Sequence, residues 1–196
     1  MKLWLVRHGQ TDWNVAKRYT GQTDVPLAAE GHRQAVRLGN YLSGLRVDAF
    51  FCSDLRRAQQ TAQAIAVRCG VTASLDRRLR EASFGRWEGL SFAEASEQFP
   101  NDVEAWIQDP MEAAPTEGES LAALRHRIAD WLAFLDGRAI ESALVVSHGG
   151  PIRVLLCELL GVPLVRHYRF RIAPGDLAVI EKFDEEGILC YLGPAK

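Results

Sequence analysis

Long hydrophobic runs are missing from this sequence, although 47% of its 196 residues are hydrophobic. No apolar stretch reaches the roughly 18 residues that a membrane-spanning helix needs, so contact with a membrane is not expected. Met1-Lys2 leads straight into a short apolar segment and lacks the pattern of a secretory signal peptide. These absences predict a cytoplasmic protein.

Cysteine is scarce and unpaired in the sequence. The four cysteines, Cys52, Cys69, Cys157 and Cys190, are far apart, and no two of them form a C-x-x-C pair. This spacing argues against a disulfide framework and against a zinc ribbon. Three of the four lie in apolar stretches, where cysteine usually serves as a small buried side chain.

An excess of charge of either sign is also lacking. The 23 Lys and Arg residues nearly balance the 25 Asp and Glu residues, which leaves a net charge of -2. Capture of nucleic acid or of an anionic membrane surface is therefore not expected. Nineteen of the 23 cations are Arg, whose forked guanidinium suits phosphate or carboxylate, although codon bias alone also enriches arginine.

Short apolar segments alternate with segments of helical periodicity, and this order indicates the fold class. Strands buried on both faces are expected at residues 3–6, 49–52 and 143–146, with a shorter one at about 73–75. Helices are expected at residues 27–42, 53–67, 121–135 and 151–160, and a hairpin at 176–183 and 188–192. The alternation predicts a three-layer α/β/α sandwich on a mostly parallel sheet, as one domain over residues 1–196.

Several residues are expected to begin or end these helices. Ser53 or Asp54 is a plausible N-cap for the helix that follows the second strand, and Gly70 is its expected end. Gly161 is the expected end of the helix that opens at Pro151.

Residues 82–120 interrupt the alternation with short helical pieces and the three prolines Pro100, Pro110 and Pro115. We expect this segment to form an inserted helical cap. It carries nine acidic residues against one cation, Arg86, which gives the segment a net charge of -8. A pocket roofed by such a segment should repel additional negative charge, unless most of the acids lie on a solvated outer face.

Polar residues follow each of the three buried strands. The first strand ends in Arg7-His8-Gly9, the second in residues 53–57 and the third in Ser147-His148-Gly149-Gly150. The carboxyl ends of parallel strands form the ligand crevice of such sheets, so these segments should meet. We expect Arg57 to point inward, whereas Arg56 reads as an ordinary surface charge.

Clustered histidines can indicate a metal site, but an anion site fits these residues better. Arg7 stands beside His8, and a cluster of guanidinium groups would repel a divalent cation. The same groups bind phosphate oxygens, and the helix that opens at Pro151 offers free N–H groups. We therefore expect no metal and no cofactor.

Four blocks of the sequence resemble the histidine phosphatase (phosphoglycerate mutase-like) superfamily. They are residues 5–14 (LVRHGQTDWN), 53–62 (SDLRRAQQTA), 79–89 (LREASFGRWEG) and 147–150 (SHGG). The resemblance spans nearly the whole chain and implies the phosphoglycerate mutase-like fold. Within the superfamily the sequence is most similar to the α-ribazole phosphatases of cobalamin assembly.

The resemblance implies a mechanism and a set of site residues. His8 would attack phosphorus and form a phosphohistidine, and the neighbouring arginines should keep its ring neutral. Phosphoryl oxygens would be held by Arg7, Asn14, Arg57, His148 and Gly149. Glu81 would be the general acid, with Glu88 as the alternative.

The expected ligand is a small phosphomonoester, with α-ribazole 5'-phosphate preferred and phosphoglycerates poor. The aromatic residues Phe84, Trp87 and Trp106 of the cap could contact a planar base or could simply pack its core. Two readings of the same superfamily stay open, a phosphoglycerate mutase and a broad-specificity phosphatase. A non-catalytic module that binds a phosphorylated ligand is the alternative of another class, and the sequence leaves monomer and homodimer open.

Overall fold

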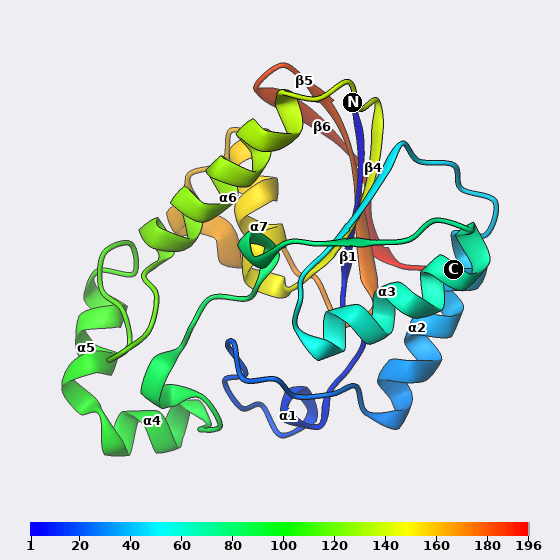
Figure 1. The fold of residues 1–196 in the computed structure, drawn as a ribbon. Helices are drawn as coiled ribbons and strands as arrows, with labels where there is room; N and C mark the ends of the chain where they lie inside the picture. Colours follow the sequence, from blue (N-terminus) through cyan, green and yellow to red (C-terminus); the bar gives the residue numbers. More distant parts are fainter. Residues whose placement is uncertain (196) are drawn as a thin grey trace.

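The computed structural model describes residues 1–195 and contains one six-stranded sheet with the order β3-β2-β4-β1-β5-β6 (Figure 1). The strands are β1 (Lys2–Arg7), β2 (Ala49–Cys52), β3 (Ser74–Leu75), β4 (Ser142–Ser147), β5 (Asp176–Phe183) and β6 (Glu186–Pro194). The first four strands are parallel, whereas β5 pairs antiparallel with both β1 and β6. The predicted mostly parallel sheet is confirmed, with the predicted hairpin at its edge.

Helices cover both faces of the sheet (Figure 1). One face packs against α2 (Ala29–Tyr41) and α3 (Arg56–Cys69), and the other packs against α6 (Leu121–Asp136) and α7 (Gly149–Leu159). Successive side chains of β4 point to opposite cores: Leu144 and Val146 face α2 and α3, whereas Ala143 and Val145 face α6 and α7. Burial on both faces explains the unbroken apolar run of this strand.

The predicted helical cap consists mainly of α4 (Phe92–Gln98) and α5 (Pro100–Gln108), which stand apart from the sheet in Figure 1. Ser91 caps α4 in a reciprocal pair with Glu94, and Pro100 occupies the first turn of α5, where no backbone donor is needed. The cap has a small core of its own in which Trp87 is fully buried against Ala95 and Val103. Trp87 is therefore a packing residue of the cap.

The remaining helical pieces are short. α1 covers Asp12–Val15, and 3₁₀ turns cover Arg77–Leu79, Gly85–Trp87 and Leu164–Arg169. No helix within residues 1–195 combines the length and the apolar character required to cross a membrane.

Two predicted helix starts are wrong. α3 begins at Arg56 with Leu55 at its N-cap, and neither Ser53 nor Asp54 caps it, because other partners engage both of these side chains. α7 begins at Gly149 rather than at Pro151, since β4 passes into the helix directly after His148. The predicted end of α3 at Gly70 is confirmed: this residue has a left-handed backbone with φ 69°.

Candidate active site

The ends of three strands bring the two histidines and Arg57 together. The rings of His8 and His148 lie 5.0 Å apart between centroids, and both side chains are buried. Arg57, in the first turn of α3, is also fully buried, and its Nε donates to Nδ1 of His148 at 3.2 Å. This placement of Arg57 agrees with the expectation that its side chain points inward.

The His8 ring has one occupied and one free nitrogen. Its Nδ1 lies 2.7 Å from the carbonyl oxygen of Gly9, so Nδ1 carries the proton and donates to that carbonyl. Nε2 keeps its lone pair, and His8 lines a hollow together with Arg7, Asn14 and Glu81. This tautomer presents a nucleophilic nitrogen to whatever occupies the hollow.

Burial and positive neighbours keep both histidines neutral. Desolvation is the main cause that lowers the pKa of His8 well below its usual value, and Arg57 and Arg7 lower it further. Burial also lowers the pKa of His148, with Arg57 as the next cause. Neutral imidazole is the form that can act as a nucleophile.

These two buried histidines predict a loss of stability in acid. Below about pH 6.5 the unfolded chain binds protons that the folded chain does not bind, so the free energy of unfolding should fall by about 1.4 kcal/mol per pH unit for each histidine. Urea unfolding at several pH values between 7.5 and 5 checks this. His8→Ala should reduce the slope and the exposed His126→Ala should not; an unchanged slope in His8→Ala would contradict the prediction.

The backbone that follows His8 is held by close contacts. The N–H of Gly9 donates to Oγ1 of Thr61 at 3.1 Å, and that hydroxyl donates to the carbonyl of Arg57 at 2.8 Å. A Cβ at Gly9 would lie 2.4 Å from the backbone oxygen of Gly31, so only glycine allows the loop to pack there. Thr61 thus ties the loop of His8 to the helix that carries Arg57.

The guanidinium groups of Arg7 and Arg57 are fixed by backbone carbonyls. Arg57 donates to the carbonyls of Thr23 at 2.9 Å and Gly21 at 2.6 Å, and Arg7 donates to that of Ile172 at 2.6 Å. The Nε of Arg7 is buried and has no hydrogen-bond partner within residues 1–195. Burial lowers the pKa of Arg57 to about 10, so it stays charged at neutral pH. An anion is the ligand that such preorganised donors fit.

Asn14 offers a free donor to the hollow, whereas His148, which was also expected to bind phosphate, does not line it and has protein partners at both ring nitrogens. Oδ1 of Asn14 accepts from the N–H of Thr11 at 3.0 Å, which leaves its amide nitrogen for the hollow that it lines. His148 accepts from Arg57 at Nδ1, so its Nε2 carries the proton and donates to Oγ of Ser53 at 2.8 Å. Gly149 follows at the start of α7, where a Cβ would lie 3.4 Å from the guanidinium carbon of Arg7.

The structure separates the two candidate acids. Oε1 of Glu81 accepts from the N–H of Gly150 at 3.0 Å, and Glu81 lines the hollow with His8. A Cβ at Gly150 would lie 2.2 Å from that oxygen, so glycine is needed for the contact. The carboxylate of Glu88 instead accepts from the backbone N–H groups of Gln22, Thr23 and Phe84 and from the Thr23 hydroxyl, and it does not line the hollow. Glu88 holds a loop in place.

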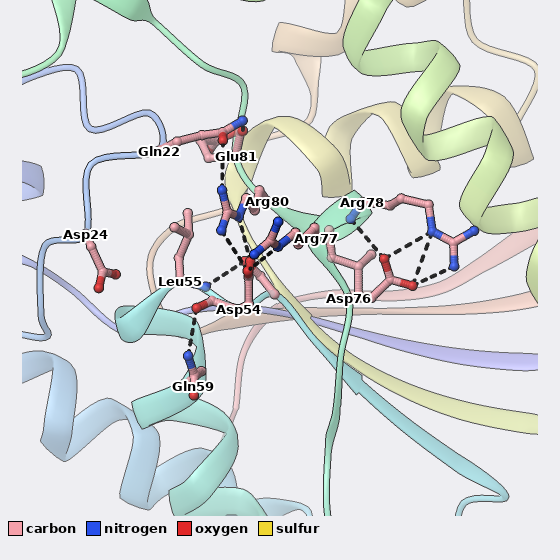
Figure 2. A network of polar contacts seen from close by, with 12 residues as sticks. Gln22, Asp24, Asp54, Leu55, Gln59, Asp76, Arg77, Arg78, Arg80 and Glu81 are labelled. Atoms are coloured by element: carbon pink, nitrogen blue, oxygen red, sulfur yellow. Dashed lines mark hydrogen bonds and ion pairs between the residues drawn. The ribbon is translucent and has the colours of Figure 1, made fainter.

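A polar network supports Glu81 from behind (Figure 2). Arg80 binds both carboxylate oxygens of Asp54, at 2.6 and 2.7 Å, and also contacts Oε1 of Gln22 at 3.3 Å. The side-chain amide of Gln22 donates to the backbone carbonyl of Glu81 at 3.2 Å. The hydrogen bond with Arg80 is the main cause that lowers the pKa of Asp54. Asp54 was expected only as a helix cap, and Gln22 and Arg80 were given no role; opposite charges in two matched blocks were the available signal.

A second hollow adjoins the first and shares Glu81 and Phe84 with it. It has a cavity volume of about 130 Å³ and opens to solvent, and apolar side chains dominate its lining: Ala82, Phe84, Trp106, Pro110, Leu121 and Leu124. Its polar lining consists of Glu81, Glu119, Arg153 and His167, besides the backbone of Gly150. We call this hollow the leaving-group cleft, because it opens next to the candidate acid.

The charges of the cap are placed differently from the expectation. Arg86, the one cation of residues 82–120, is exposed and pairs with Glu117 at 2.9 Å. The cation of the cleft is Arg153 of α7, which lies outside residues 82–120. Among the nine cap acids only Glu119 lines the cleft, and Arg127 neutralises it at 2.8 Å. The net charge of residues 82–120 therefore does not describe the lining of the cleft.

Metal ligands do not gather at this site. Within residues 1–195 no group of three or more His, Cys, Asp and Glu side chains is arranged to hold a metal ion. Arg7 and Arg57, whose positive charges lower the pKa of His8, would themselves neutralise a bound phosphate.

Comparisons with known proteins agree on a family. Residues 3–191 match the family model of the histidine phosphatase superfamily (branch 1). The adenosylcobalamin/alpha-ribazole phosphatase of Escherichia coli is 34% identical over 92% of this chain and 90% of its own. Phosphoserine phosphatase 1 of Hydrogenobacter thermophilus is 32% identical over 98% of this chain and 95% of its own. A crystal structure of a putative alpha-ribazole-5'-P phosphatase from E. coli superimposes with a TM-score of 0.93 at 32% identity, covering 100% of this chain and 97% of that one.

Proposed function

Because this chain belongs to the histidine phosphatase superfamily, we propose that it hydrolyses a small phosphomonoester, α-ribazole 5'-phosphate, through a phosphohistidine formed on His8. The observation that carries the mechanism is the neutral His8 ring, whose free Nε2 faces a hollow beside two arginines. The alternative of a non-catalytic binding module leaves this free nucleophile and the acid beside it unexplained.

In the first step Nε2 of His8 attacks phosphorus as the bond from phosphorus to the ester oxygen breaks. Positive charge develops on the ring, and the Gly9 carbonyl, which already accepts from Nδ1, stabilises it. Arg7, Arg57 and the Asn14 amide bind the phosphoryl oxygens and the charge that spreads over them. Glu81 gives its proton to the departing alkoxide, so the alcohol leaves neutral.

In the second step water attacks the phosphohistidine. Glu81, now a carboxylate, takes the proton of the water, and the bond between phosphorus and Nε2 breaks. Inorganic phosphate is released and His8 returns to its starting tautomer, with the proton of Nδ1 held by Gly9 throughout. Glu81 suits both steps because Gly150 orients its carboxylate at the edge shared by the two hollows.

The choice of substrate draws on the relatives and on the cleft. The E. coli relative and the E. coli crystal structure are α-ribazole phosphatases by their names, and the apolar and aromatic lining of the leaving-group cleft suits a planar base. The phosphoserine enzyme among the relatives shows that this family accepts other leaving groups, so the substrate needs a direct test.

Phosphate release from a panel of phosphomonoesters supplies that test. We expect kcat/KM to be highest for α-ribazole 5'-phosphate and lower for phosphoserine and 3-phosphoglycerate, whose small carboxylate-bearing leaving groups leave the apolar cleft unfilled. A higher value on either of these two acids would contradict the assignment. Transfer of phosphoryl groups between phosphoglycerates without release of phosphate would indicate a mutase.

A chelator should leave turnover unchanged, because arginine side chains neutralise the phosphate. Vanadate should inhibit, since it adopts the trigonal geometry of the phosphoryl transition state. Phosphate release after exhaustive dialysis against EDTA, with and without added magnesium or zinc, checks the first point. Activity lost on dialysis and restored by either metal would refute it.

A further inference from the structure

The leaving-group cleft contains a cation that the two chemical steps do not use. Arg153 lies in the first half of α7, and its Nε donates to the backbone carbonyl of Phe170 at 3.0 Å. Within residues 1–195 its guanidinium forms no ion pair with a carboxylate, so the terminal nitrogens keep their charge and their donors for a ligand.

Arg153 lies close to the phosphate site as well as to the cleft. The guanidinium groups of Arg7 and Arg153 flank Gly149, because a Cβ there would lie 3.4 Å from the Cζ of Arg7 and 3.5 Å from Nη1 of Arg153. The carbonyls of Phe170 and Ile172, two residues apart in one segment, orient the two arginines. A group bound by Arg153 must therefore belong to the part of the substrate near the phosphoester.

His167 supplies the opposite hydrogen-bonding character in the same cleft. Its Nδ1 donates to the backbone carbonyl of Leu164 at 3.0 Å, which leaves Nε2 as an acceptor without a partner within residues 1–195. Burial lowers the pKa of His167, and Arg153 lowers it further, so the ring is neutral at pH 7. Arg153 and His167 thus supply one donor group and one acceptor, as a pair, to the lining of the same cleft.

A hydroxyl is the ligand group that satisfies both members of this pair. Its oxygen accepts from Arg153 and its proton is donated to Nε2 of His167. A carboxylate would satisfy Arg153 but would place an anion against the lone pair of His167. The pair consequently distinguishes a sugar from a carboxylic acid as the leaving group.

The apolar side of the cleft indicates what is attached to that sugar. Phe84 and Trp106 line it with the aliphatic Leu121 and Leu124, and aromatic side chains of this kind favour planar rings.

We propose that Arg153 and His167 bind a ribose hydroxyl of a nucleoside 5'-phosphate, whose base packs on Phe84 and Trp106, and that this pair selects nucleosides over carboxylic acids. The proposal rests on the proposed function, since it concerns the leaving group of the same reaction. It assigns specificity to α7 and to the turn Leu164–Arg169, outside the cap.

The experiment compares substrates that differ only in the ribose hydroxyls. Wild type, Arg153→Met and His167→Phe are assayed on adenosine 5'-monophosphate, on its 2',3'-dideoxy analogue and on p-nitrophenyl phosphate, which has no sugar. Arg125→Met and His126→Phe are the matched controls, because both residues are exposed on α6 and neither lines the cleft or the hollow of His8.

We expect the wild type to prefer the ribonucleotide by about 10- to 100-fold in kcat/KM, the value of a hydrogen bond to a charged group. Either cleft variant should abolish this preference and leave p-nitrophenyl phosphate turnover near that of wild type. The double variant should be no worse than the single variants, because both side chains hold the same hydroxyl. The two control variants should keep the preference.

Other results would overturn the proposal. An equal loss on p-nitrophenyl phosphate would place Arg153 in the phosphate site or in folding, and a preserved preference in both variants would remove the pair from recognition. A wild type that hydrolyses neither nucleotide would refute the hydroxyl subsite. Nucleotide selectivity that depends on the pair, without hydrolysis of α-ribazole 5'-phosphate, would uphold the subsite and refute only the named substrate.

Discussion

Replacing His8 with alanine is expected to abolish phosphate release, with the rate falling to that of the uncatalysed reaction for all phosphomonoesters. The variant keeps Arg7, Arg57 and Glu81, so it should still bind phosphate, but no nucleophile remains in the hollow. A phosphoenzyme that is labile in acid and stable in base should be trapped after a rapid quench of wild type and should be absent from His8→Ala.

The matched control is His126→Ala, which removes an exposed histidine of α6. It should retain full turnover and form the phosphoenzyme. Because His8→Ala removes a buried ring, circular dichroism should be used to check that the variant is folded. Its affinity for inorganic phosphate should be measured in the same preparation. Substantial turnover by folded His8→Ala would show that water attacks phosphorus directly and that the covalent mechanism is wrong.

The sheet and the convergence of its loops could be predicted from the sequence because they follow from local patterns. The runs at 49–52 and 143–146 are apolar throughout, since both of their faces are covered by helices. Once the strands are parallel, the residues after them must meet at one edge, and this placed His8 and His148 side by side.

The start of α3 illustrates where local pattern fails. Ser53 and Asp54 have the residue types of an N-cap, but Ser53 accepts from His148 and Asp54 binds Arg80. Side chains from distant segments compete with the helix end for these oxygens. A hydrogen bond to the buried His148 or to the Arg80 guanidinium is more stabilising than one to the first N–H groups of the helix, which water can also solvate.

The lining of the leaving-group cleft could not be predicted from the sequence for a related reason. Whether Arg153 faces the cleft depends on the rotation of α7 and on the Phe170 carbonyl, and neither is encoded in the residues next to Arg153. The charge of the cap was equally uninformative, since Glu119 is neutralised by Arg127, while Arg86 turns outward to Glu117. Net charge describes a segment, whereas specificity depends on the few side chains that reach the ligand.

The proton donor could be chosen between Glu81 and Glu88 only from the contacts that each carboxylate makes in the structure. Both lie in the same matched block, and both are carboxylates near glycine. Glu88 is surrounded by donors of the loop at 22–23, so its removal should loosen the segment that also binds Arg57. Glu81 accepts from the backbone N–H groups of Ala82 and Gly150, and its side chain borders both hollows.

Replacing Glu81 with glutamine should therefore slow the first step in a way that depends on the leaving group. An alkyl phosphate such as α-ribazole 5'-phosphate leaves as a strongly basic alkoxide and needs a proton, so formation of the phosphoenzyme should slow by about 10²- to 10⁴-fold. An aryl phosphate such as p-nitrophenyl phosphate releases a stable phenolate, and its burst of p-nitrophenol should remain close to that of wild type.

The later hydrolysis of the phosphohistidine should slow for both substrates, because Glu81 also accepts the proton of water. A burst followed by a slow phase should then become visible with the aryl substrate. Rapid-quench measurement of the phosphoenzyme on each substrate separates the two steps.

Glu88→Gln is the matched control. Because Glu88 holds a loop in place, its replacement should lower thermal stability and affect alkyl and aryl substrates alike. If Glu81→Gln slowed the phenol burst as much as the alkyl reaction, the role of Glu81 would be structural; if Glu88→Gln alone discriminated between the substrates, Glu88 would be the proton donor.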